Sequence, residues 1–190
     1  MGEDGLSVNA RGYGLFGADG PGAKWQVKGT GDFNGDGKSD IVFQYADTGA
    51  VYIWQMADDG LNVKARGYGL FGADGPGAKW QVKATGDFDD DGNSDILFQY
   101  ADTGAVYIWE MADDGLSVKA RGLVGEPEGY GPKWEVKGAG NFDGDGKSDI
   151  LWQYADTGEC YVWELDGLTI KARDFVGGSN GPGADWHATV

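Results

Sequence analysis

The chain has 190 residues, with 31 acidic and 15 basic side chains and a formal net charge of −16. This charge argues against nucleic acids and anionic membrane surfaces as partners, because both would repel it. The single cysteine, Cys160, excludes an internal disulfide framework, and it occupies the place of Val51 and Val106 in strand-like runs, as a small core residue would. The 36 glycines and 13% aromatic residues favour a turn-rich, all-β fold.

One sequence pattern returns along the whole chain. Corresponding tryptophans are separated by 55, 54 and 52 residues: Trp25, Trp80, Trp134 and Trp186. A period of this length is typical of propeller blades, so we interpret the chain as a single β-propeller repeat domain. Its units are residues 5–59, 60–114 and 115–166, with a partial unit at 167–190. The first two units differ at 8 of 55 positions, which indicates recent duplication or deliberate design.

Each unit contains four strand-like segments. In the first unit, Leu6–Arg11 alternates apolar with polar residues, and a glycine-rich segment with aromatic residues leads to the second strand at 25–31. The third strand, 40–45, and the fourth, 50–56, are apolar on both faces and are joined by a tight Asp-Thr-Gly turn. We therefore expect blades of four antiparallel strands. Each runs from the small residues ending 25–31 at the axis to an exposed, charged edge strand such as 61–66.

An acidic loop separates the second and third strands of each unit. It spans Asp32–Asp40 and returns at 87–95 and 141–149. Oxygen-bearing side chains at loop positions 1, 3, 5 and 9, with the carbonyl of position 7, suit a hard cation, and the glycine at position 6 permits a sharp turn. Such residues also favour plain turns, but a plain turn does not need the acceptors in register in every copy.

The ligand types in this loop favour one cation over others. Oxygen ligands on a flexible loop favour Ca²⁺ over Mg²⁺, and the lack of sulfur and imidazole argues against zinc. An EF-hand would place a bidentate glutamate at position 12, where this chain has Phe43, Phe98 and Trp152 in strand-like runs. Three bound Ca²⁺ ions would reduce the net charge from −16 to −10.

The segment Gly31–Ile41, with its copies at 86–96 and 140–150, resembles the FG-GAP/VCBS repeat. That family forms calcium-stabilised β-propellers in integrin α-subunits and in secreted bacterial and fungal proteins. The resemblance implies about three Ca²⁺ ions per chain and an extracellular or secreted protein. It also implies these metal ligands, with residues at position 7 acting through their carbonyls: Asp32, Asn34, Asp36, Lys38, Asp40, Asp87, Asp89, Asp91, Asn93, Asp95, Asn141, Asp143, Asp145, Lys147 and Asp149.

Departures from the family pattern narrow the expected function. The Phe-Gly pair is absent from the third unit, and Tyr45-Ala46-Asp47 replaces the family's Gly-Ala-Pro, which argues against integrin-like recognition. The repeats look closer to lectin-like members, including fungal lectins whose seven-bladed propellers bind N-acetylglucosamine between blades. We therefore expect a binding module for glycans or glycoproteins. The candidate contact residues in and beside the linker loops are Tyr13, Phe16, Asp19, Arg66, Tyr68, Phe71, Asp74 and Tyr130. The tryptophans of the fourth strand-like segment are more typical of inter-blade core: Trp54, Trp109 and Trp163.

The sequence also bears on two other classes of function, a structural protein and an enzyme. The near-identity of the first two units also fits a structural, self-assembling propeller fragment with no ligand beyond metal. An enzyme is not expected, because the sole histidine, His187, has no evident Ser or Cys partner and the carboxylates recur in every unit.

Closed propellers have about four to eight blades, so three full blades with spare strands at 6–11 and 186–190 predict a homo-oligomer, most simply a dimer completing one ring of six or seven blades.

Overall fold

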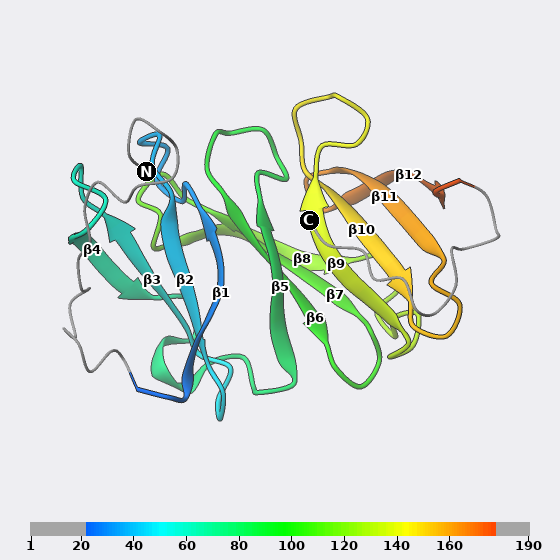
Figure 1. Cartoon of the computed structure of the whole chain (residues 1–190), viewed down its shortest axis with the longest axis horizontal. Helices are drawn as coiled ribbons and strands as arrows, with labels where there is room; N and C mark the ends of the chain where they lie inside the picture. Colours follow the sequence, from blue (N-terminus) through cyan, green and yellow to red (C-terminus); the bar gives the residue numbers. More distant parts are fainter. Residues whose placement is uncertain (1–21, 178–190) are drawn as a thin grey trace, which may run out of the picture.

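The computed structural model describes residues 22–177, and these residues form three sheets that lie side by side (Figure 1). Each sheet is antiparallel and has four strands. The first contains β1 (Trp25–Gly31), β2 (Asp40–Tyr45), β3 (Val51–Met56) and β4 (Val63–Tyr68). The second contains β5 (Trp80–Gly86), β6 (Asp95–Tyr100), β7 (Val106–Met111) and β8 (Val118–Val124). The third contains β9 (Trp134–Gly140), β10 (Asp149–Tyr154), β11 (Cys160–Asp166) and β12 (Thr169–Phe175).

The strand order confirms the predicted all-β, blade-like architecture. In every sheet the strands follow one another in sequence order, and β5 contacts both β1 and β9. These three strands are therefore the inner strands, and β4, β8 and β12 are the outer edges. Each sheet takes its outer strand from the following sequence unit. The expected spare strands at 6–11 and 186–190 lie outside the described residues.

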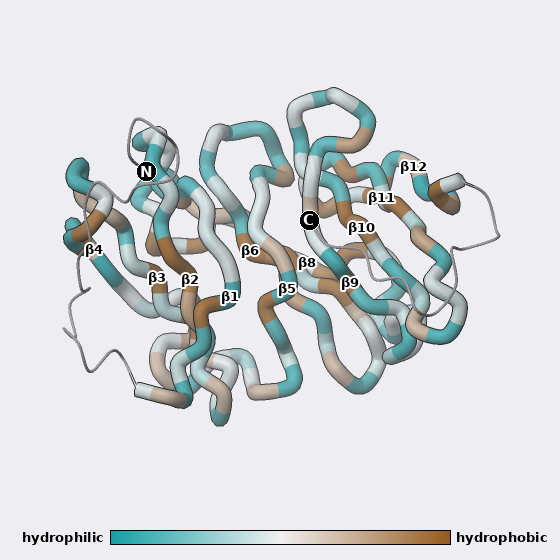
Figure 2. Tube along the Cα trace, viewed as in Figure 1, coloured by the Kyte–Doolittle hydropathy of each residue, from teal (hydrophilic) through white to brown (hydrophobic). Residues whose placement is uncertain are grey.

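The core lies between neighbouring sheets. Hydrophobic residues lie along β2, β6 and β10 (Figure 2). One buried cluster joins Phe33 and Ile53 of the first sheet region to Val82 and Trp109 of the second, and an equivalent cluster joins the second sheet to the third. Sheets that are covered on both faces need apolar residues on both faces, which explains the continuous apolar runs of the two middle strands. Among the described residues, no helix has the length and apolar character of a membrane span.

Each outer strand contains a bulge at a lysine. The register of β4 against β3 omits one residue, Lys64, between Val63 and Ala65. The same irregularity omits Lys119 in β8 and Lys171 in β12. A bulge turns the side chain of its extra residue away from the regular alternation of the strand. The side chains of these three lysines reach the acidic loops.

Candidate functional site

The acidic loops join each inner strand to the next strand of its sheet. Glycine at loop position 6 has a positive φ in all three copies, 83° at Gly37, 89° at Gly92 and 101° at Gly146, as the sequence predicted. Position 4 also has positive φ, and the second loop places Asp90 there with φ 63°. Asp90 is the only non-glycine residue with positive φ in the described part of the chain. The sharp loop backbone is therefore shared by all three copies.

The aspartate at position 9 ties the loop to its sheet. In the second loop, Asp95 accepts hydrogen bonds from the backbone N–H of Phe88 (2.9 Å) and of Met111 (2.8 Å). Asp40 and Asp149 accept the equivalent pairs of bonds in the other two loops. All three side chains are fully buried. The position predicted as a metal ligand therefore also has a structural role, which the loop spacing alone did not reveal.

Burial changes the acidity of two of these aspartates, Asp95 and Asp40. Removal from water, helped by the nearby carboxylates of Asp89 and Asp87, raises the pKa of Asp95 to about 8, although the two amide hydrogen bonds lower it. Burial also raises the pKa of Asp40. A cation bound beside Asp95 would offset this cost by stabilising the ionised form.

The second loop brings three carboxylates together. Ligand oxygens of Asp87, Asp89 and Asp95 all lie within 4.8 Å of one another. Asp87 accepts hydrogen bonds from the backbone amides of residues 90–92, which hold its carboxylate in place. One oxygen of Asp89, Oδ1, is buried and has no hydrogen-bond partner in the described part of the chain. This orphaned acceptor and the converging carboxylates fit a divalent cation with oxygen ligands.

Backbone amides of the same loop also donate hydrogen bonds to other predicted ligands. Asp91 accepts a bond from the amide of Asn93 at 2.8 Å and pairs with a lysine. In the first loop, Asp32 accepts bonds from the amides of Asp36 (3.1 Å) and Gly37 (2.6 Å). The third loop begins with Asn141, whose side-chain oxygen accepts a bond from Gly144 N–H at 2.7 Å. Each loop thus curls its amides around the side chain at position 1.

The bulged lysines reach into the loops. Lys119 Nζ lies 2.6 Å from Asp89 Oδ2 and also pairs with Asp91. Lys171 lies 3.1 Å from Asp143 and 2.7 Å from Asp145, and in the first loop Lys64 lies 3.5 Å from Asp36. Because of these pairs, the pKa of Lys171 is raised and that of Asp145 is lowered. Each ammonium therefore offsets part of the negative charge that the loop would otherwise hold.

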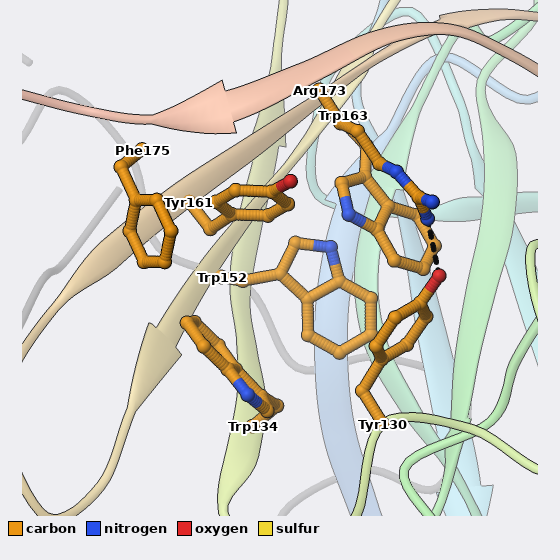
Figure 3. Close-up of a pocket in the computed structure, with 7 residues that line it drawn as sticks. All are labelled: Tyr130, Trp134, Trp152, Tyr161, Trp163, Arg173 and Phe175. Carbon is orange, nitrogen blue, oxygen red and sulfur yellow. Dashed lines mark hydrogen bonds between the residues drawn. The ribbon is translucent and has the colours of Figure 1, made fainter. Parts of the chain in front are cut away.

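A second kind of feature is an aromatic pocket on the third sheet (Figure 3). The cavity has a volume of about 220 Å³ and is lined by Tyr130, Trp134, Trp152, Tyr161, Trp163, Arg173 and Phe175. Arg173 donates a hydrogen bond to the Tyr130 hydroxyl and stacks over its ring at 5.8 Å. The indole N–H of Trp152 is buried and has no hydrogen-bond partner among the described residues. The pocket thus combines aromatic walls with polar groups, one of which has a free donor.

The second sheet has an equivalent pocket of about 290 Å³, lined by Phe71, Gly75, Pro76, Trp80, Phe98, Tyr107 and Trp109. Here Phe98 takes the place of Trp152, and Arg121 stacks over Phe71 at 5.7 Å. Phe98 offers no N–H, so this pocket lacks the free donor of the third-sheet pocket.

The linker loops form one wall of these pockets and are attached to the preceding sheet. Gly77 N–H donates to the carbonyl of Thr48 at 2.9 Å, and Gly131 N–H donates to that of Thr103 at 2.8 Å. These bonds join each linker to the tight turn that connects the two middle strands of the previous sheet. The pockets therefore lie where one sheet meets the next.

The structure divides the predicted ligand-contact residues into three groups. Phe71 and Tyr130 each line one of the two aromatic pockets. Tyr68 lines neither pocket, and its ring centroid lies 4.7 Å from that of Tyr52. Arg66 and Asp74 also line neither pocket. Three further residues lie outside the described part of the chain: Tyr13, Phe16 and Asp19.

The tryptophans expected in the core have two roles. Trp109 and Trp163 are each 2% exposed and belong to the buried clusters, and both also line pockets. Sequence reasoning missed the strand residues on the pocket walls, such as Trp134 and Tyr161. Their recurrence as Trp80 and Tyr107 was the available signal.

The FG-GAP repeat model matches residues 29–54, a segment that runs from β1 through the first acidic loop and β2 into β3. No curated protein matches the chain at a significant level. The second and third sheets repeat the same strands, acidic loop and tight turn as the matched segment. The chain therefore carries an FG-GAP repeat within a blade-like array of β-sheets, in a module of the β-propeller type.

Proposed function

We propose that this chain is a calcium-stabilised, non-catalytic binding module that takes glycans in aromatic pockets between its sheets. The acidic loops supply the calcium sites, and the sheets position the pockets. The observation that carries the ligand proposal is the unpartnered, buried N–H of Trp152 among aromatic rings. We place the protein outside the cell, where free calcium is abundant enough for sites of modest affinity.

The calcium proposal is supported by the converging oxygens of the second loop. Asp87, Asp89 and Asp95 would supply the carboxylates, and the position-7 carbonyl of Asn93 would complete one side of the site. A bound Ca²⁺ would compensate the negative charge of these carboxylates. The hydrogen bond from Met111 N–H to Asp95 would then connect the cation to β7, and the bond from Phe88 N–H would connect it to the loop, so binding and sheet stability are coupled.

The glycan proposal is supported by the chemistry of the third-sheet pocket. Sugar rings present C–H faces that pack on aromatic side chains, while their hydroxyl and acetamido oxygens need hydrogen-bond donors. Trp134 and Tyr161 offer aromatic faces, and Trp152 N–H offers a donor with no partner among residues 22–177. An acetamido carbonyl is a suitable acceptor, because leaving a buried N–H unpaired costs about 1–3 kcal/mol.

A glycan array on the calcium-loaded protein tests this proposal, followed by calorimetric titration with N-acetylglucosamine. Trp152→Phe reproduces the aromatic residue of the second-sheet pocket, and it removes the indole N–H together with one ring of the indole. We expect it to weaken binding about tenfold, as the loss of one buried hydrogen bond does. Arg173→Lys should also weaken binding, and the matched Arg121→Lys should not. Equal affinities in Trp152→Phe and the parent would contradict the assignment to this pocket.

A purely structural module is the second candidate function, favoured by the near-identity of the first two sequence units. Such a module would bind metal and self-associate without any sugar ligand. The array separates the two candidates, since no binding above background to any glycan would leave only the structural function.

A further inference from the structure

Two apolar residues at opposite ends of the sheet array are exposed, although their counterparts are buried. Val27 on β1 is 62% exposed, whereas the corresponding Val82 and Val136 are 3% and 5% exposed. Phe142, in the third acidic loop, is 49% exposed, whereas Phe33 and Phe88 in the other loops are fully buried. Within residues 22–177, a neighbouring sheet covers the buried members of each set, and none covers Val27 or Phe142.

The internal junctions show what covers these positions. Phe33 belongs to the same buried cluster as Val82 of the following sheet, and Phe88 belongs to the same cluster as Val136. One side of a junction therefore presents the loop phenylalanine, and the other side presents the inner-strand valine. Phe142 and Val27 are the unmatched members of this pairing.

Cys160 is also only partly buried, whereas Val106 at its place in the second sheet is 1% exposed. The expectation that Cys160 is a core residue therefore fails in this array, since no described sheet covers it.

Backbone hydrogen bonds define the same junction. Ser94 N–H donates to the carbonyl of Asp32 at 2.6 Å, and Ser148 N–H donates to that of Asp87 at 2.6 Å. The residues at the corresponding places on the two end faces are Ser39 on the first sheet and Asn141 on the third. A junction between these faces would therefore repeat a bond that already occurs twice.

A buried glutamine makes further bonds across each internal junction. Gln44 donates to the carbonyl of Trp80 at 2.8 Å and accepts from Val82 N–H at 3.1 Å. Gln99 makes the same two bonds with the third sheet, at 2.7 and 3.2 Å. The end faces are thus equivalent to the two halves of a junction with defined hydrogen bonding as well as apolar contact.

We propose that the outer face of the third sheet binds the outer face of the first sheet of a second copy of this chain. The third sheet of the second copy binds the first sheet of the first copy in the same way, and this second contact closes a two-chain ring. Two copies supply six such sheets, which is within the range of about four to eight blades found in closed propellers. A head-to-tail contact that did not close would instead produce an open filament.

One residue of the third sheet opposes this contact, so replacing that residue should strengthen the association. At the internal junctions, Leu116 approaches Gly67 and Leu168 approaches Gly122, where an added Cβ would lie only 3.4 and 3.1 Å from the leucine. The corresponding residue of the third sheet is Asp174, which would face Leu61 of the second copy. A carboxylate against a leucine is unfavourable without a partner, so Asp174→Gly should tighten the association at least about tenfold.

Sedimentation velocity on the calcium-loaded chain tests the proposal, with variants on both end faces. We expect a dimer with twice the mass of the 20.2 kDa chain. Asp174→Gly should strengthen the association, and Val27→Asp and Phe142→Asp should each abolish it. Leu123→Asp is the control, because Leu123 is 42% exposed on the middle sheet, away from both end faces. A monomer at all concentrations, or a dimer that the end-face variants do not weaken, overturns the proposal.

A disulfide test does not depend on destabilising variants. An added Cβ at Gly29 would lie 3.2 Å from the side chain of Thr85, so Gly138→Cys with Thr30→Cys places two thiols at the equivalent point of the proposed junction. In a Cys160→Val background, which restores the residue found at this place in the other two sheets, oxidation should give a covalent dimer. The single variant Gly138→Cys should not. A ladder of longer multimers would contradict the closed ring, and the absence of any crosslink would contradict the junction.

Discussion

The ammonium nitrogen of Lys119, on the outer strand β8, lies 2.6 Å from a carboxylate oxygen of Asp89 in the second acidic loop. Lys119 reaches this position because it is the extra residue of a β-bulge. A fixed positive charge therefore lies beside the carboxylates that we assign to calcium. A divalent ion entering this loop has to displace the ammonium or share its carboxylates with it.

Lys119→Met should increase the calcium affinity of the second loop about tenfold, which corresponds to about 1.4 kcal/mol. The methionine keeps the apolar part of the side chain and removes the competing charge. Without calcium, the same variant should be less stable than the parent, because the carboxylates lose their counter-charge. Calorimetric titration and thermal unfolding measure both effects. Lys79→Met is the control, since Lys79 pairs with the exposed Asp102. An unchanged or lower affinity in Lys119→Met would contradict the competition.

Asp95→Asn should destabilise the protein by about 1–3 kcal/mol, even without metal. The asparagine offers one acceptor oxygen in place of two, so either Phe88 N–H or Met111 N–H loses its partner. Chemical denaturation in the presence of a chelator measures this cost. Asp102→Asn is the matched control on an exposed turn and should change stability by less than about 0.5 kcal/mol. Equal effects of the two substitutions would argue against the structural role of Asp95.

The contribution of Asp95 to folding stability should fall as the pH rises, whereas that of a typical aspartate rises. Because burial raises the pKa of Asp95 to about 8, the folded protein holds this proton more tightly than the unfolded chain does. Without calcium, the contribution of Asp95 is complete below about pH 4 and is lost as the pH rises toward 8. Calcium binding at pH 7 should therefore release a proton. Calorimetric titrations in buffers with different ionisation enthalpies detect this release, and identical heats would contradict it.

Asp90→Gly should stabilise the protein by about 1 kcal/mol, since a non-glycine residue with φ 63° is strained. The first and third loops already have Gly35 and Gly144 at this position, with φ 67° and 83°. Thermal unfolding with and without calcium measures the gain. Asp90→Ala is the control, because it removes the carboxylate and keeps the backbone strain. A similar gain in both variants would assign the effect to charge rather than to conformation.

The repeat spacing and strand patterns predicted the sheets and their strand order, because β2 and β3 have to be apolar on both faces when sheets cover them on either side. The glycine at loop position 6 was predictable for the same kind of reason, since the sharp loop requires positive φ. The bulges at Lys64, Lys119 and Lys171 were not predictable, because a bulge depends on pairing between strands. The role of Asp95 in binding Met111 N–H was also missed, since that contact joins residues that are distant in the sequence.

The pockets were predictable only in part. Phe71 and Tyr130 stood out as aromatic residues in glycine-rich linkers, and both line pockets. Trp152 instead occurs in an apolar strand pattern, where a buried indole is expected to be core. Its unpartnered N–H becomes evident only from the packing around it.

Calcium stoichiometry tests the central proposal most directly. Protein stripped with a chelator should bind about three Ca²⁺ ions per chain in a calorimetric titration, with a rise in Tm as the loops fill. Asp36→Ala should remove one ion and leave the other two loops loaded. Failure to bind any calcium at millimolar concentration would contradict the account of the acidic loops as metal sites.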